Sequence, residues 1–101
     1  MYNIKIDQDA LNDLKEIVIW YNNQVQNLGL RFHKQVKSQI NTLKNQPYIC
    51  NIRYEDMRCM LVKKFPFMIH YKINDESYLV EIFAVFHTSR HPEIWNSRIK
   101  K

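Results

Sequence analysis

Polar and apolar residues alternate with two different periods in the first half of the chain. Residues 2–6 alternate strictly and predict a short strand, whereas apolar positions three and four apart predict an amphipathic helix over about residues 8–24. A second stripe of this kind predicts a helix over about residues 28–45, with Asn27 as its cap and Pro47 just beyond its end. The short connection between the two helices predicts an antiparallel hairpin.

The second half reads as three successive strands joined by turns at residues 65–67 and 74–77. Residues 48–56 are expected to be irregular with a little extended structure, and the first strand to begin near Met57. The middle strand, residues 67–73, alternates between a face for the core and a face expected to be wetter. The last strand, residues 78–86, is apolar on both faces except at Glu81, which predicts a place inside the sheet.

These elements predict an α+β fold in the order β-α-α-β-β-β, followed by a short C-terminal tail. Helices grouped against a mostly antiparallel sheet give this class of fold. Neither an internal repeat nor a composition shift divides the chain, so residues 1–101 are expected to form a single domain.

Composition and charge narrow the possible partners and compartments. Hydrophobic residues make up 46% of the chain, enough for a core, and no apolar run is long enough to cross a membrane. The N-terminus has no secretory pattern, so a cytoplasmic protein is expected, with Cys50 and Cys59 as reduced, small apolar residues. The net charge of +5 suits an acidic partner, either a nucleic acid or an acidic protein segment.

Residues able to support chemistry are concentrated at the ends of the predicted strands. With a single glycine the chain cannot build a phosphate-binding loop, and His87 and His91 leave a strand instead of sharing a helix face, so neither cofactor nor metal is expected. The polar and aromatic residues at the strand ends are Arg58, Lys63, Lys64, His70, His87, Arg90, His91, Trp95 and Arg98.

This cluster has two interpretations. Metal-free phosphodiester cleavage needs a base, an acid and a cation for the phosphate. His87 or His70 could serve as base or acid, and Arg58 and Arg90 could hold the phosphate through paired hydrogen bonds. The other interpretation, which the residues by themselves favour, is a basic exposed rim.

The order of elements and a set of short signatures together resemble the RelE/ParE superfamily of bacterial toxin–antitoxin toxins. The signatures extend over nearly the whole chain: Asp13-Leu14 and Ile17, Leu28-Gly29 and Phe32, Phe65-Pro66-Phe67, Ile69 and Tyr71, then Val85, His87, Arg90, Pro92 and Trp95. The resemblance implies a small basic toxin that is neutralised by a cognate antitoxin encoded beside it. Such an antitoxin is small and acidic and wraps a helical or extended segment around the toxin; operator DNA would be bound only through it.

Within this superfamily, RelE-like members cut mRNA on the ribosome and ParE-like members poison DNA gyrase. The RNase members carry lysines, an arginine and a tyrosine at positions that align near Cys59 and Leu61, at Met68 and at Trp95, and none of these residues matches. The resemblance therefore favours a ParE-like growth inhibitor that breaks no bonds. Its target or partner would be recognised by Arg58, Lys63, Lys64, His87, Arg90, His91, Trp95 and Arg98.

Two alternatives remain open from the sequence. In a RelE-like mRNA endonuclease, His87 would act as base or acid while Arg58 and Arg90 hold the phosphate. In an inactive protein with the toxin fold, the chain would only bind the antitoxin and repress transcription jointly with it. A basic protein suits all three roles, so charge alone does not separate them.

Overall fold

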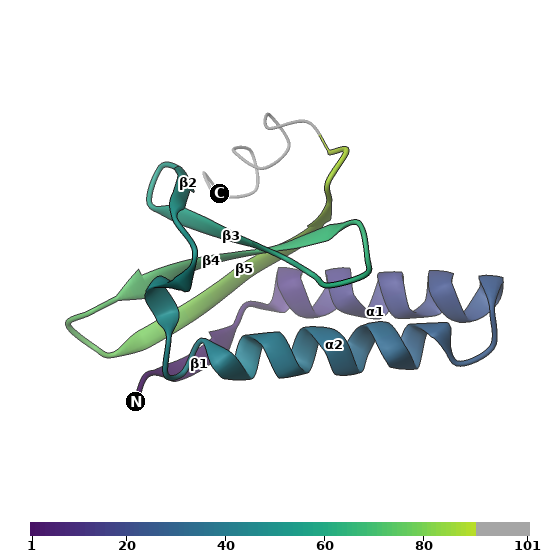
Figure 1. The fold of residues 1–101 in the computed structure, drawn as a ribbon, viewed down its shortest axis with the longest axis horizontal. Coiled ribbons are helices and arrows are strands. Elements are labelled where there is room, and N and C mark those ends of the chain that lie inside the picture. The colour runs from purple at the N-terminus through teal and green to yellow at the C-terminus, as the bar shows by residue number, and fades with distance from the viewer. Residues whose placement is uncertain (91–101) are drawn as a thin grey trace.

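The computed structural model describes residues 1–90 as two helices packed on one five-stranded sheet (Figure 1). The helices are α1 (Gln8–Gln24) and α2 (Leu28–Thr42), and a 3-10 turn, η1, covers Pro47–Ile49. The strands are β1 (Asn3–Ile6), β2 (Ile52–Tyr54), β3 (Met57–Leu61), β4 (Phe67–Asn74) and β5 (Leu79–His87). Their order across the sheet is β1-β5-β4-β3-β2.

The α+β fold expected from the hydrophobic pattern is confirmed, and β5 does lie between two strands. It pairs in parallel with β1 and antiparallel with β4. The region expected to be irregular contains η1 and a short strand, β2, which the sequence pattern did not predict as an element. Only three residues long, β2 pairs with β3 through an irregular register, so it has no room for a readable alternation.

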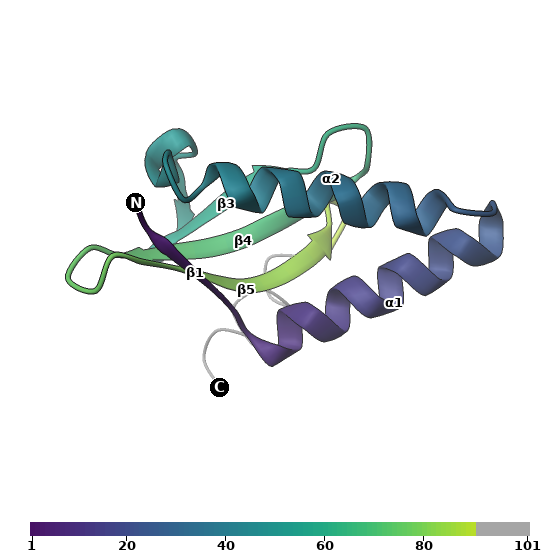
Figure 2. The same ribbon diagram turned by 90° about the horizontal axis from the view of Figure 1, so that it is seen from below.

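The helical hairpin covers one face of the sheet (Figure 2). An aromatic cluster joins it to the sheet: the Phe32 ring of α2 lies 5.5 Å from Tyr21 of α1, 5.1 Å from Phe65 and 5.3 Å from Phe67. Below this cluster, buried aliphatic residues of β4 and β5 complete the core, among them Ile69, Val80 and Ile82.

The hairpin turn depends on two residues with special backbone roles. Asn27 is the N-cap of α2, as the sequence predicts, and it adopts a left-handed conformation with φ of 66°, which asparagine tolerates better than most residues. Gly29 follows where α2 crosses α1, and its N–H donates to Asn22 Oδ1 at 2.8 Å. The missing side chain at Gly29 is what allows the two helices to approach this closely.

The expectation of a wet second face on β4 is wrong. Met68 and His70 point away from the helices, yet they are 5% and 0% exposed. They contact a second, smaller apolar cluster that includes Ala84 and Phe86 of β5, with Tyr54 and Cys59 at its margin. Alternation correctly separated the two faces of the strand but did not reveal that both are covered.

Candidate functional site

The β3–β4 turn and the end of β5 lie at the same end of the sheet. Phe67, at the start of β4, pairs with His87, and the Thr88 N–H donates to the Pro66 carbonyl at 2.9 Å. Lys63 and Lys64 occupy the adjacent turn and are exposed. The fold therefore gathers four of the predicted site residues, Lys63, Lys64, His87 and Arg90, at one end of the sheet.

His87 and Arg90 line one small pocket of about 60 Å³, beside Asp13 and Glu16 of α1. The negative charge of the two carboxylates exceeds the positive charge of the single guanidinium there, so the pocket does not favour a phosphate. Its volume is also well below the ~300 Å³ at which ligand pockets begin. Asp13 has a structural role as well, because its Oδ2 accepts the Val85 N–H at 3.0 Å.

The His87 ring is held in one orientation by its own loop. Its Nδ1 accepts the Ser89 N–H at 3.0 Å, and the Ser89 hydroxyl lies 2.7 Å away from the same atom. Because Nδ1 acts as acceptor, the neutral ring carries its proton on Nε2. Arg90 is exposed, and its guanidinium lies 5.9 Å from the centre of the Phe86 ring.

Arg58 is placed away from this end of the sheet. It pairs with Tyr71, four residues along β4 from Phe67, an offset of about 13 Å along the strand. Its guanidinium donates to the Cys50 carbonyl at 2.5 Å and lies 4.9 Å from the centre of the Tyr48 ring. The groups required by the phosphodiester hypothesis, His87, Arg90 and Arg58, are therefore not brought together.

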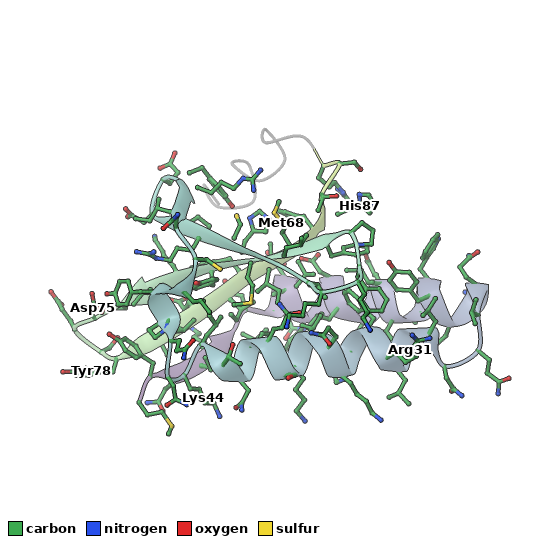
Figure 3. The ribbon with its side chains drawn as sticks, viewed as in Figure 1. Arg31, Lys44, Met68, Asp75, Tyr78 and His87 are labelled. Atoms are coloured by element: carbon green, nitrogen blue, oxygen red, sulfur yellow. The ribbon has the colours of Figure 1, made fainter. Side chains whose placement is uncertain are left out.

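A set of hydroxyl–carboxylate contacts closes the opposite end of the sheet, where Asp75 lies (Figure 3). The hydroxyls of Tyr2 and Tyr48 both donate to the Asp75 carboxylate. The Tyr48 and Tyr2 bonds hold the pKa of Asp75 below its ordinary value, and the bond to Asp75 raises the pKa of Tyr2 to about 12. These contacts fasten β1 and η1 to the β4–β5 turn and serve the fold.

Sequence reasoning missed a polar group on the sheet face away from the helices. The Tyr54 hydroxyl lies 2.9 Å from His70 Nδ1, and Cys59 Sγ lies 3.4 Å from the same atom. The Arg53 guanidinium reaches Met68 Sδ at 3.5 Å. Cys59 and His70 are paired across β3 and β4, so the register could have suggested their contact, but Arg53 and Tyr54 arrive from the unpredicted β2.

Within this group, burial disfavours the ionised forms of the Tyr54 hydroxyl and the Cys59 thiol. It raises the pKa of the Tyr54 hydroxyl far above its usual value and that of the Cys59 thiol to about 11. His70 is fully buried, and within residues 1–90 this face presents no exposed histidine. The arrangement lacks an accessible base or a ready nucleophile for attack on a phosphodiester.

The raised pKa of Cys59 predicts slow alkylation. In a Cys50→Ser variant, where Cys59 is the single cysteine, iodoacetamide at pH 8 should react about a hundredfold more slowly with folded protein than with urea-unfolded protein. The two-unit rise in pKa lowers the reactive thiolate by that factor, since only the thiolate attacks. Mass spectrometry of timed samples gives both rates, and equal rates would show an accessible, ordinary thiol.

Three predicted site residues, His91, Trp95 and Arg98, lie outside the described residues. Across residues 1–90, histidine, cysteine and carboxylate side chains form no group of three that could hold a metal ion. In the same part of the chain, neither helix has the length and apolar content needed to cross a bilayer.

Comparison with known proteins gives one family match and several structural ones. The model for the ParE toxin of the type II toxin–antitoxin system, parDE, matches residues 4–92. Curated protein sequences include none that matches the chain.

Solved structures of two kinds of toxin share the fold. The chromosomal ParDE system of P. aeruginosa matches at 18% identity and a TM-score of 0.73, over 86% of this chain and 96% of that one. A mutant of the E. coli toxin RelE in the free state matches at 19% identity and a TM-score of 0.74. The match covers 98% of this chain and 95% of that one. The intact E. coli RelBE toxin–antitoxin complex matches at 18% identity and a TM-score of 0.66. The match covers 89% of this chain and 100% of that one. At such low identity these likenesses show a common fold.

Proposed function

The chain belongs to the ParE toxin family of type II toxin–antitoxin systems, and from this premise we propose that it inhibits growth by binding a target protein such as DNA gyrase. A cognate antitoxin, of the kind present in the ParDE and RelBE structures, would neutralise it. In this proposal the exposed cations at the end of the sheet, Lys63, Lys64 and Arg90, contact the target.

The observation that supports binding over cleavage is the separation of the groups that cleavage needs. His87 and Arg90 share a small pocket with two carboxylates, and the Arg58 guanidinium is engaged at a distant part of the sheet. On the sheet face away from the helices, Met68 and His70 are buried, and His70 contacts Tyr54 and Cys59 and, within residues 1–90, no exposed group of the phosphodiester hypothesis. A protein recognition surface needs none of these groups to converge on one phosphate.

The test compares a variant that removes proton transfer with one that changes the exposed charge. We expect His87→Gln to inhibit DNA supercoiling by purified gyrase as strongly as the wild type, because an amide keeps hydrogen bonding while losing acid–base chemistry. Arg90→Glu should weaken inhibition at least about tenfold, since reversal of an interface charge slows association and opposes docking.

Two outcomes would overturn the proposal. One is normal supercoiling at high concentrations of the wild-type protein. The other is mRNA cleavage in the presence of ribosomes that His87→Gln abolishes, because loss of a general acid or base costs on the order of 10² to 10⁴ in rate. That second result would establish the RelE-like activity in its place.

A further inference from the structure

The exposed side of α2 carries several positive charges and no negative one. The cations are Arg31, Lys34 and Lys37 of the helix and Lys44 just beyond its last residue, and together they are called the basic face. Arg31 and Lys44 lie toward opposite ends of α2 (Figure 3). Residues 17–54 include no aspartate or glutamate, so no neighbouring carboxylate along the chain offsets these charges.

Gln39 joins the basic face to the β3–β4 turn. Its side-chain amide donates to the Leu61 carbonyl at 2.9 Å, and its side-chain oxygen accepts the Lys63 N–H at 2.9 Å. Lys63 and Lys64 therefore lie beside α2, and residues 57–74 also include no aspartate or glutamate. The two lysines proposed to contact the target protein are thus continuous with the basic face.

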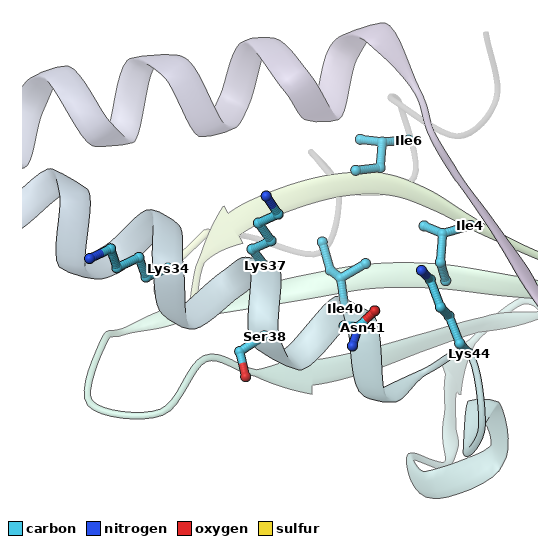
Figure 4. Close-up of a pocket in the computed structure, with 8 residues that line it drawn as sticks. All are labelled: Ile4, Ile6, Lys34, Lys37, Ser38, Ile40, Asn41 and Lys44. Atoms are coloured by element: carbon cyan, nitrogen blue, oxygen red, sulfur yellow. The ribbon is translucent and has the colours of Figure 1, made fainter.

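Small polar side chains occupy the space between these cations. Ser38 and Asn41 lie on α2 beside Lys37 and Lys44 (Figure 4), and residues 31–44 include none of the exposed large apolar side chains. Hydroxyl, amide and ammonium groups are the side-chain groups that contact phosphate oxygens in protein–DNA complexes. Lysine and serine are depleted in protein–protein interfaces, so this composition favours a phosphate backbone over a protein partner.

An apolar groove of about 660 Å³ borders the basic face on the side of β1. Its floor is Ile4, Ile6 and Ile40, and lysines of the basic face form its rim (Figure 4). Among the described residues, no aromatic side chain lines this groove, so unpaired bases would find no ring on which to stack. A duplex, whose bases are already paired and stacked, needs only the cations.

We propose that the basic face binds the phosphate backbone of duplex DNA held by the target protein, an inference that rests on the proposed function. From Arg31 to Lys44 the face extends about 20 Å along the helix axis. Duplex DNA carries one phosphate charge per about 1.7 Å of its axis, so this length presents about twelve phosphates to four cations. Because Lys63 and Lys64 adjoin the basic face, a protein bound at the end of the sheet and DNA bound along α2 would be neighbours.

Two double variants of equal net charge test the basic face. Arg31→Gln with Lys34→Gln removes two of its four cations. The control, Lys5→Gln with Lys72→Gln, removes two cations that both pair with Glu81 in the sheet register and do not lie on α2. All four positions are exposed or half-exposed, so both double variants should fold and should keep a Tm close to that of the wild type.

The probe is a fluorescently labelled DNA duplex of mixed sequence and about 20 base pairs, and its anisotropy reports binding between about 50 and 200 mM salt. Four phosphate contacts predict that the wild-type affinity falls about 150-fold over this range, because each neutralised phosphate releases counterions. The Arg31→Gln/Lys34→Gln variant should lose only about tenfold, as expected for two contacts, and should bind more weakly than the wild type at low salt. The control should show the salt dependence of the wild type.

The inference is overturned if the wild type does not bind the duplex at low salt, or if the two double variants show equal salt dependence. Tighter binding of an RNA duplex of the same length would overturn it in favour of an RNA site. Tighter binding of poly-L-glutamate at the same concentration of charge would assign the basic face to an acidic protein.

The failures of the two proposals are distinguishable, because the anisotropy measurement contains no target protein. In a supercoiling assay with purified gyrase at low salt, Arg31→Gln/Lys34→Gln should inhibit at least about tenfold more weakly than the control variant. If the wild type leaves supercoiling normal while duplex binding depends on the basic face, the proposed function fails and the duplex-binding face remains. If both double variants inhibit supercoiling equally, the target is bound without DNA contact by α2, and only this inference is overturned.

Discussion

Replacing Phe32 by alanine is expected to lower the free energy of unfolding by about 3–5 kcal/mol, the range for removal of a buried aromatic ring. Phe32 is fully buried, and its ring lies within 5.1 to 5.5 Å of Phe65, Phe67 and Tyr21. It is therefore the residue through which the hairpin holds the β3–β4 turn. A domain of this size has a total stability of roughly 5–15 kcal/mol, so the variant should be partly unfolded under mild conditions.

Urea unfolding followed by circular dichroism measures this loss. Leu30→Ala provides the control, because Leu30 is in the same helix and 48% exposed, and it should change the free energy of unfolding by about 0.5 kcal/mol or less. A loss near 1 kcal/mol for Phe32→Ala would mean that the aromatic cluster closes over the space or is loosely packed.

The second large effect is expected at Gly29, where local helix propensity and tertiary packing predict opposite signs. Alanine is favoured over glycine inside a helix by about 1 kcal/mol. A Cβ at Gly29, however, would overlap the backbone carbonyl of Val18 and come within 2.7 Å of Asn22 Oδ1. A backbone atom cannot move aside without separating α1 from α2, so we expect Gly29→Ala to destabilise by about 3 kcal/mol, as overpacking does.

Thermal unfolding decides the sign at this position. Gly29→Ala should lower Tm by about 10 °C or more, given about 4–8 °C per kcal/mol in a domain of this size. Ser38→Ala, at an exposed position of the same helix, should leave Tm unchanged or slightly higher. An increase in Tm for Gly29→Ala would show that the helices can separate at little cost.

Much of the fold was readable from local periodicity. The two helices, the strands β3, β4 and β5, and the internal place of β5 all follow from spacings that reflect which side of an element meets the core. The aromatic pair Phe65 and Phe67 marked the turn that Phe32 secures. Such signals are local and repeat along one element, so a single sequence is enough to show them.

The candidate site was readable only in part, because it depends on register. The sequence placed Arg58, His70 and His87 together at the strand ends. The pairing of β3, β4 and β5 places Arg58 about 13 Å along the strand from His87 and buries His70 beneath Phe86 and Tyr54. The bulge between His70 and Tyr71 shifts this register by one residue, and no pattern of single residues reveals it.

By itself the sequence determined the elements, the fold class and the resemblance to a toxin family, because each rests on residue order and spacing along one chain. The tertiary structure decided which charges share a surface. It set His87 and Arg90 beside two carboxylates of α1, and it collected the lysines of α2 around an apolar groove bordered by β1. These neighbours are distant in the sequence, and only the packing of the hairpin on the sheet brings them within contact.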